Sequence, residues 1–182
     1  MPRLETDRLL LRPFNENDLE DFFEYAKMPE IGPNCGWEPI NDKEKAIERL
    51  NRMISHDYYA IVLKENNKVI GSVSLFDLDK RRYDNIETED NAKEVGFVLS
   101  RDYWGKGYMQ EAVKAVLDYA FNALNVEAVY AITKKNNTRS EKLQEKLGFE
   151  VVGEQPEVIW LHGEIVSMLQ RKISKKDWLN KE

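Results

Sequence analysis

Two glycines one residue apart, Gly105 and Gly107, stand between a predicted strand and a predicted amphipathic helix, and this junction constrains the fold more than any other segment. Glycine lets the backbone turn tightly and approach a ligand without a Cβ in the way. A helix that begins at such a turn directs unpaired N–H groups and the positive end of its dipole outward, which favours bound phosphate. The run 103–109 is therefore predicted to cradle a phosphorylated cofactor, although a Gly-x-Gly is also typical of an ordinary tight turn.

The rest of the pattern predicts an α/β chain with a mixed, mostly antiparallel central sheet of about six or seven strands and helices on both faces. Asn15 or Asn17 is expected to cap the first helix. Asn41 or Asp42 is expected to cap the second, which has Ile47, Leu50 and Ile54 on one face. Residues 29–39 are expected to form an irregular loop that packs or contacts ligand. The expected strands are 8–12, 58–63, 69–76, 94–99, 126–133, 150–153 and 164–173. The later helices are expected at 109–120 and at 138–147, and the second of them is ended by Gly148. The helix at 109–120 has an apolar stripe formed by Met109, Ala112, Val113, Val116, Leu117 and Ala120.

Length and composition indicate a single domain over residues 1–182. They also limit the classes of molecule that the protein is expected to bind. No apolar run approaches the ~20 residues of a membrane span, and no signal-peptide core is expected at the amino terminus. The only cysteine, Cys35, excludes an internal disulfide and suits a reducing cytoplasm. A net charge of −6 disfavours nucleic acid and suits a cationic substrate. Residues 84–90 are expected to be a solvated acidic loop or a rim that attracts substrate, and the separated His56 and His162 predict no metal site.

Two nucleotide-binding signatures fail at the glycine turn. A dinucleotide fingerprint requires a third glycine where Gln110 stands, and the Gly-Lys-Ser/Thr of a P-loop is missing. The run instead resembles the acyl-CoA-binding motif of the GNAT superfamily of N-acetyltransferases, which reads Gln or Arg, two residues, Gly, one residue, then Gly or Ala. Trp104 departs from that pattern as expected for the RimJ/RimL-type branch, which commonly has Tyr-Trp-Gly-Lys-Gly-Tyr. Met109 departs from the small residue usual there, and either crowds the pyrophosphate or points into the core.

The resemblance covers nearly the whole chain. Residues 4–13 are similar to the amino-terminal signature of the RimJ/RimL-type branch. Asn137 and Ser140 match an Asn-x-x-Ser motif that opens a helix in the family, and residues 145–149 match the run that closes it. Three separated motifs in the right order are far more specific than any one of them.

The resemblance implies acetyl-CoA as the cofactor. It also implies that the strands ending near Leu99 and Thr133 splay apart to admit the pantetheine chain, with a backbone N–H near Leu99 holding the thioester carbonyl. The pyrophosphate is expected on Gly105, Lys106, Gly107 and Tyr108, with Lys106 reaching a phosphate. The remaining cofactor-binding residues implied by the resemblance are Val98, Leu99, Ser100, Trp104, Met109 and Asn137.

Acetyl transfer to an amine needs a base for the amine proton and an acid for the leaving thiolate. The resemblance implies Glu94 as the base, acting through water, and Ser140 as the acid, with Tyr108 as an alternative acid. The alternative for Glu94 is a strand carboxylate that faces solvent, and the alternative for Asn137 is an ordinary helix cap. Ser140 is alternatively a hydroxyl in the first turn of a helix, and Tyr108 an aromatic ring that packs on the adenosine or on the helix. No activating base is legible near Cys35, so direct transfer in a ternary complex is preferred.

The sequence thus predicts an acetyl-CoA-dependent N-acetyltransferase acting on a primary amine, either a protein N-terminal α-amine or a small molecule. The alternatives are an acyl-CoA-binding module without catalysis, or nucleotide-phosphate binding by an unrelated mechanism. The acceptor and the choice between monomer and homodimer stay open.

Overall fold

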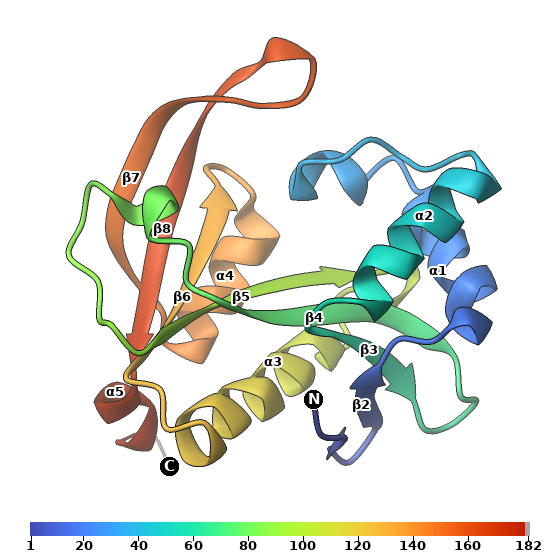
Figure 1. Cartoon of the computed structure of the whole chain (residues 1–182), viewed down its shortest axis with the longest axis horizontal. Coiled ribbons are helices and arrows are strands. Elements are labelled where there is room, and N and C mark those ends of the chain that lie inside the picture. Colours follow the sequence, from blue (N-terminus) through green and yellow to red (C-terminus); the bar gives the residue numbers. More distant parts are fainter. Residues whose placement is uncertain (181–182) are drawn as a thin grey trace. The chain divides into compact units, whose positions relative to one another are not determined.

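The structure, a computed structural model, describes residues 1–180 (Figure 1). The chain forms two compact units, the first built from residues 1–74 and 97–116 and the second from residues 75–96 and from 117 onward. The strands are β1 (Leu4–Glu5), β2 (Leu9–Pro13), β3 (Tyr58–Leu63), β4 (Val69–Asp77), β5 (Ala92–Leu99), β6 (Ala128–Lys134), β7 (Glu150–Ile159) and β8 (Ile165–Ser174). The α-helices are α1 (Leu19–Ala26), α2 (Lys43–Ile54), α3 (Tyr108–Asp118), α4 (Thr138–Leu147) and α5 (Lys175–Leu179).

The strands are hydrogen-bonded in the order β1-β2-β3-β4-β5-β6-β8-β7, and β5 and β6 form a parallel pair. The mixed, mostly antiparallel sheet is confirmed, but residues 1–180 contain eight strands rather than six or seven. The strand that the sequence pattern missed is β1, which has only two residues and therefore no alternation to detect. The parallel register of β5 and β6 covers Ala92↔Ala128 to Glu94↔Tyr130, so it ends before β5 does.

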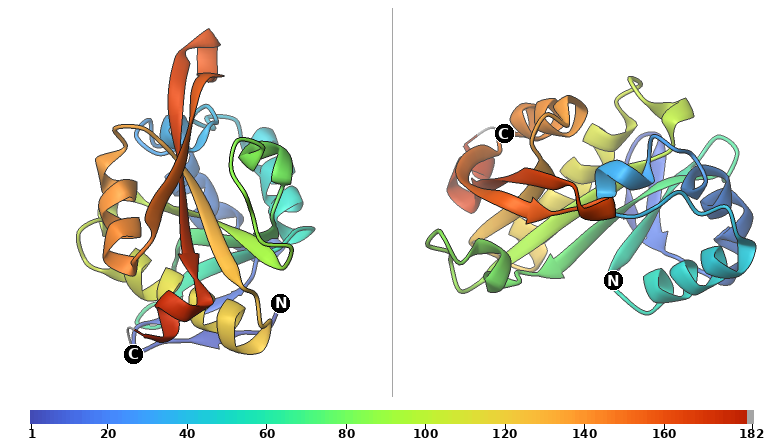
Figure 2. Two further views of the ribbon diagram at one scale, coloured as in Figure 1. Left: turned by 90° about the vertical axis from the view of Figure 1, so that its left-hand side faces the viewer. Right: turned by 90° about the horizontal axis from the view of Figure 1, so that it is seen from above.

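In the first unit, α1 and α2 lie on one side of β2, β3 and β4, and α3 lies on the other (Figures 1 and 2). Asn15 caps the one-turn helix that leads into α1, and Asp42 caps α2 through the N–H of Glu44. Of the three residues predicted to share one face of α2, Leu50 is buried but Ile47 is 41% exposed. The buried residues of the helix are Ala46, Leu50 and Met53, which follow helical spacing.

Residues 29–39 are not wholly irregular. Gly32–Cys35 form a short 3₁₀ helix with Pro33 in its first turn, where a missing N–H costs nothing. Ile31 is buried and Trp37 packs against the core of the first unit. A Cβ on Gly32 would lie 2.3 Å from the carbonyl oxygen of Trp37, so this segment is a packing element.

In the second unit, β7 and β8 form a long antiparallel hairpin whose end extends well beyond α4 (Figure 2, left). Strand β7 is longer than predicted. Its register shifts between Gln155 and Val158, where Glu157 has a φ of 57°. Such a bulge interrupts the alternation on which a strand prediction depends. Helix α4 has the predicted bounds, with Asn137 as its cap and Gly148 at a φ of 93° after its end.

Helix α3 begins directly after the glycine turn, and all six residues of its predicted apolar stripe are buried. None of the helices within residues 1–180 combines the length and apolar character required to cross a bilayer.

Candidate active site

The glycine turn of the first unit has the backbone geometry of an anion cradle. Gly105 and Gly107 have φ values of 75° and 81°, in the left-handed region that other residues avoid. Alternating left-handed and right-handed residues turn successive N–H groups toward one side, and such a concave arrangement binds anions. The N–H groups of Gly105, Lys106, Gly107 and Tyr108 donate to no other group within residues 1–180, and a Cβ on Gly105 would meet nothing within 4 Å. Four donors therefore stand unpaired at the start of α3.

The turn is tied to the end of β5. The indole N–H of Trp104 donates to the carbonyl oxygen of Leu99 at 2.9 Å. Lys106 Nζ donates to the carbonyl oxygen of Asp102 at 3.0 Å and lies 5.2 Å from the centroid of the Tyr103 ring. The ammonium group of Lys106 therefore contacts the residues that precede the glycine turn.

The predicted thioester-lining residues lie at the end of β5. The N–H of Ser100 donates to the carbonyl oxygen of Ile70 on β4 at 2.8 Å. A Cβ on Gly71 of β4 would lie 2.3 Å from the carbonyl oxygen of Val98, so only glycine permits this close approach. Because backbone groups alternate along a strand, the N–H and C=O of Leu99 point away from β4.

Met109 and Tyr108 have different surroundings. Met109 is 7% exposed, so of its two predicted orientations it adopts the one in which the side chain points into the core. The Tyr108 ring packs under the guanidinium group of Arg8, 4.3 Å from the ring centroid, and meets the Tyr103 ring edge to face.

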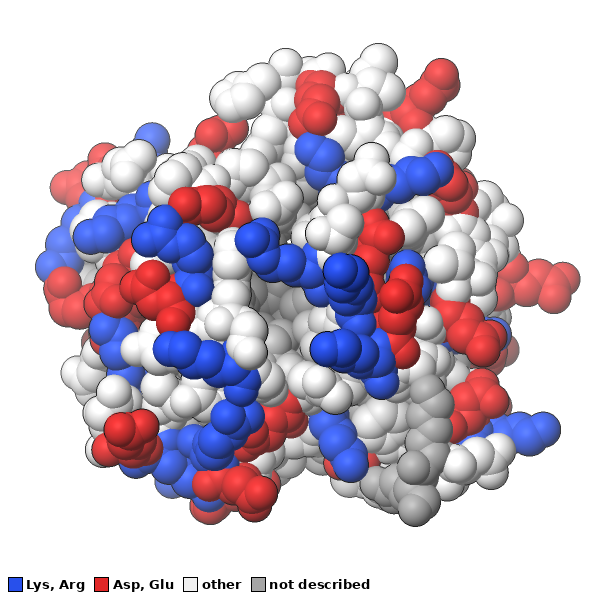
Figure 3. Space-filling model, turned by 180° about the vertical axis from the view of Figure 1, so that it is seen from behind, with Lys and Arg blue, Asp and Glu red and all other residues white. Residues whose placement is uncertain are grey.

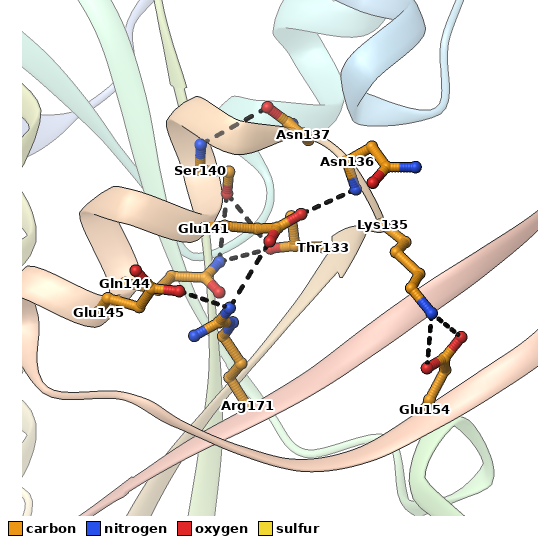
Figure 4. Close-up of polar contacts among 10 residues, drawn as sticks. All are labelled: Thr133, Lys135, Asn136, Asn137, Ser140, Glu141, Gln144, Glu145, Glu154 and Arg171. Atoms are coloured by element: carbon orange, nitrogen blue, oxygen red, sulfur yellow. Dashed lines mark hydrogen bonds and ion pairs between the residues drawn. The ribbon is translucent and has the colours of Figure 1, made fainter.

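Ser140, in the second unit, belongs to a cluster of three polar side chains (Figure 4). The Gln144 amide donates to Thr133 Oγ1 at 2.5 Å and to Ser140 Oγ at 3.2 Å. The two hydroxyl oxygens lie 3.2 Å apart. Of the four hydrogens on these groups, three are used inside the triangle, so one hydroxyl proton points outward. The cluster can therefore donate a proton or a hydrogen bond to a further group.

Sequence reasoning missed Gln144, although its position four residues after Ser140 on the same predicted helix was a usable signal. Gln144 is 1% exposed. Its helix is anchored by Arg171 of β8, whose Nη2 lies 3.1 Å from Glu145 Oε1 (Figure 4). Glu141 accepts the backbone N–H of Asn136 at 2.8 Å, which fixes the turn before the helix.

Asn137 caps α4, which is the alternative to cofactor binding that the sequence offered for this residue. Its Oδ1 lies 3.5 Å from the N–H of Ser140, a long hydrogen bond that leaves the amide group weakly held.

Glu94 is a nearly buried carboxylate and not a solvent-facing one. It is ion-paired with Arg82, while its Oε2 accepts no hydrogen bond within residues 1–180. Burial, together with the negative charge of Glu94, raises the pKa of the neighbouring Tyr83 far above its ordinary value. This oxygen is buried, and so is the hydroxyl group of Tyr83.

Cys35 is not an activated nucleophile. The surrounding protein desolvates its thiolate and raises the thiol pKa to about 11, even though part of the residue reaches the surface. His56 has a capping contact, with Nδ1 2.7 Å from the carbonyl oxygen of Arg52 in α2.

The acidic segment 84–90 is more than a solvated loop. Glu89 accepts the hydroxyl group of Tyr130 and, at 3.1 Å, the ammonium group of Lys172. The face shown in Figure 3 mixes acidic and basic side chains and does not present one acidic surface.

A family model described as the acetyltransferase (GNAT) domain matches residues 8–150. The protein therefore belongs to the GNAT family and is an acyltransferase. Among its relatives, an uncharacterized N-acetyltransferase, p20 of Bacillus licheniformis, is 28% identical over 98% of this chain and 99% of its own length. Among solved structures, a GNAT-family acetyltransferase from Bacillus anthracis has a TM-score of 0.84 and 22% identity, covering 96% of this chain and 99% of that one.

Relatives with named acceptors are also similar. Spermidine N(1)-acetyltransferase of Escherichia coli is 31% identical over 47% of this chain and 46% of its own length. The [ribosomal protein uS5]-alanine N-acetyltransferase of Escherichia coli is 24% identical over 97% of this chain and 92% of its own length. A spermidine N-acetyltransferase from Vibrio cholerae, solved in complex with CoA and spermine, has a TM-score of 0.77 and 21% identity, covering 96% of this chain and 100% of that one.

Proposed function

We propose that this protein is an acetyl-CoA-dependent N-acetyltransferase that transfers the acetyl group directly to a primary amine in a ternary complex. The observation that carries the proposal is the set of unpaired N–H groups at Gly105, Lys106, Gly107 and Tyr108. Four amide donors and a helix N-terminus suit the charge and geometry of a diphosphate. Membership of the GNAT family supports acetyl-CoA as the molecule that carries it.

The proposal assigns the other cofactor contacts residue by residue. Leu99 offers a backbone N–H to the thioester carbonyl, where one such donor is worth roughly 3 kcal/mol of barrier. Trp104 holds the turn, and Asn137 reaches the cofactor through the amide that its long capping bond leaves available. Val98 and Ser100 line the acyl chain, and Met109 supports the turn from the core.

Acetyl-CoA supplies an acetyl group activated as a thioester, and the protein supplies the proton transfers. Glu94 takes the amine proton through a water molecule. Ser140 donates the outward hydroxyl proton of its cluster to the leaving thiolate, and Tyr108 is the alternative donor.

The relatives support a primary amine as the acceptor. Spermidine and an alanine of ribosomal protein uS5 are the acceptors named for two proteins similar to this one. We place the protein beside the RimJ/RimL-type enzymes as one N-acetyltransferase domain over residues 1–182. A cytoplasmic location fits its single cysteine.

Calorimetry with CoA tests the cradle, using Gly105→Ala and Gly163→Ala as a matched pair. Both glycines have left-handed φ values, 75° and 77°, and a Cβ on either would meet nothing within 4 Å. The two variants therefore carry similar backbone strain. We expect Gly105→Ala to weaken CoA binding by at least about tenfold and Gly163→Ala to leave it unchanged.

Thiol release with a panel of N-terminal peptides and polyamines then tests transfer. Saturable CoA binding without turnover on any amine would favour the non-catalytic acyl-CoA-binding module. Equal effects of the two glycine variants, or no binding of CoA by the parent protein, would remove the transferase proposal.

A further inference from the structure

We propose that Arg8, near the amino terminus, is a positioning residue for the cofactor cradle. It holds the glycine turn in its binding conformation and neutralises Glu111, a carboxylate in the first turn of α3. This inference rests on the proposed function, since it assigns the cradle to a diphosphate. It joins two motifs that the sequence presents separately, the amino-terminal signature and the glycine turn.

Arg8 contacts the turn directly. Its Nη1 donates to the carbonyl oxygen of Lys106 at 3.0 Å, across 98 residues of sequence. Its guanidinium group lies 4.3 Å from the centroid of the Tyr108 ring. A Cβ on Gly107 would lie 3.4 Å from Arg8 Nη2, so the side chain borders the second glycine as well. Three consecutive residues of the turn are therefore in contact with, or beside, one side chain.

Arg8 also pairs with Glu111 of α3. Its Nε donates to Glu111 Oε2 at 2.7 Å and its Nη2 lies 2.6 Å from the same oxygen. Glu111 Oε1 accepts the backbone N–H of Arg8 at 3.0 Å and the hydroxyl group of Thr6 at 2.5 Å. Both carboxylate oxygens are thus fully bonded by the segment Thr6–Arg8.

The pairing has an electrostatic consequence for an anion. Glu111 lies in the first turn of α3, the helix whose N-terminus is to bind the diphosphate. An unpaired carboxylate there would repel the ligand and compete for the same helix dipole. The positive charge of Arg8 neutralises the carboxylate of Glu111 close to the predicted diphosphate site.

Only arginine suits this position. The fork-shaped guanidinium group donates to Glu111 through Nε and Nη2, donates to Lys106 through Nη1, and stacks on Tyr108 with its face. A lysine ammonium group is a point charge, which cannot meet all three partners at once. Arginine at residue 8 therefore supplies geometry as well as charge.

The backbone that carries Arg8 is itself fixed. The N–H of Thr6 donates to the carbonyl oxygen of Leu9, and the N–H of Leu9 donates to Thr6 Oγ1, both at 3.0 Å. This turn joins β1 to β2, and β2 is paired with β3 along its length. The support for the cradle is thus a turn anchored in the sheet of the first unit.

A double-mutant cycle tests the inference, with CoA affinity measured by calorimetry for Arg8→Gln, Glu111→Gln and the double variant. We expect Arg8→Gln to bind CoA about tenfold more weakly or worse, because it leaves the Glu111 charge unpaired. Glu111→Gln should lose less, and the double variant should bind better than Arg8→Gln alone. Arg8→Lys should recover only part of the loss. Arg81→Gln is the control, since Arg81 is an exposed arginine paired with Asp79 far from the turn in sequence.

Two further measurements separate this inference from the proposed function. Pantetheine, which lacks the diphosphate, should bind Arg8→Gln and the parent protein equally. In the absence of any ligand, hydrogen exchange of the amides at residues 105–110 should be faster in Arg8→Gln than in the parent.

A double variant no better than Arg8→Gln, or full affinity in Arg8→Lys, would overturn the inference while CoA binding by the parent upholds the cofactor. Failure of the parent protein to bind CoA would instead remove the proposed function, and the exchange measurement would still decide whether Arg8 orders the turn.

Discussion

The indole N–H of Trp104 donates to the carbonyl oxygen of Leu99 at 2.9 Å, and this bond closes the turn that carries the unpaired amides. Trp104 stands where the wider superfamily has Gln or Arg, and its indole group binds the backbone at the end of β5. The residue is therefore a structural part of the cradle.

Trp104→Phe should lower the free energy of unfolding by about 1 kcal/mol, the usual net worth of one hydrogen bond, and should also weaken CoA binding. The matched control is Trp178→Phe, because the indole N–H of Trp178 donates to Asp118 Oδ1 at the same distance of 2.9 Å. Trp178→Phe should lose at least as much stability in urea titrations, because the hydrogen bond it removes is to a carboxylate. Equal CoA affinities in the two variants would contradict a role for Trp104 in the cradle.

Ser140→Ala should lower kcat by about 100-fold, within the range for general acid catalysis, with little change in the KM for acetyl-CoA. Gln144→Leu removes the donor that orients the two hydroxyl groups, so it should lower kcat by a smaller factor and shift the pH profile of kcat. The check is steady-state thiol release from pH 6 to pH 9. Unchanged turnover in Ser140→Ala would transfer the acid role to Tyr108, which Tyr108→Phe then tests.

Asp18→Asn should destabilise the first unit by about 3 kcal/mol, because it leaves a largely buried guanidinium group without its counter-charge. Arg12 binds Asp18 with two hydrogen bonds of 2.7 Å, and this bonding raises the pKa of Arg12. Chemical denaturation measures the change. Glu20→Gln, in an exposed pair with Lys43, should change stability by less than about 0.5 kcal/mol.

Acid should weaken the Arg8–Glu111 pair. Burial alone would raise the pKa of Glu111, but hydrogen bonds from Thr6 and Arg8 outweigh burial and hold that pKa below its ordinary value of 4.5. The stabilisation is therefore fully present above pH 4.5 and is lost as pH falls through the folded-state pKa. The stability difference between the parent protein and Glu111→Gln should be largest near pH 6 and shrink toward pH 2. A difference that does not change with pH would contradict this pairing.

Cys35 should react slowly with a disulfide reagent in the native protein. With a pKa of about 11, only about one thiol in a thousand is ionised at pH 8, and the thiolate is the reactive form. The rate should rise by at least about tenfold on unfolding in urea. Rapid native modification that abolishes activity would revive a covalent mechanism through Cys35.

Local signals explain the parts of the fold that the sequence predicts. The bounds of α4 follow from a capping asparagine and a terminal glycine, and the α3 stripe follows from helical spacing, all within a few residues of the element they define. The glycine turn was found in the same way. The predicted strand 150–153 is shorter than β7. The alternation of residues along β7 is interrupted by Pro156 and by Glu157, which has a positive φ.

Long-range contacts explain what the sequence does not predict. Arg8 meets the carbonyl oxygen of Lys106 across 98 residues, and no local pattern links the two. Gln144 gains its role from Thr133 on strand β6, and no local sequence pattern links these two residues. The ion pair of Glu94 with Arg82 likewise depends on how a connecting segment folds back.

The bonds between the Thr6–Leu9 turn and the start of α3 make the cradle depend on a segment that is distant in sequence. The family motif at residues 103–109 is complete as soon as it is synthesised, yet its support belongs to a segment made almost a hundred residues earlier. Loss of the first eight residues, or a rigid fusion that prevents β1 from pairing, would leave the motif intact and its shape undefined. An amino-terminal fusion that disturbs this segment is therefore expected to weaken CoA binding.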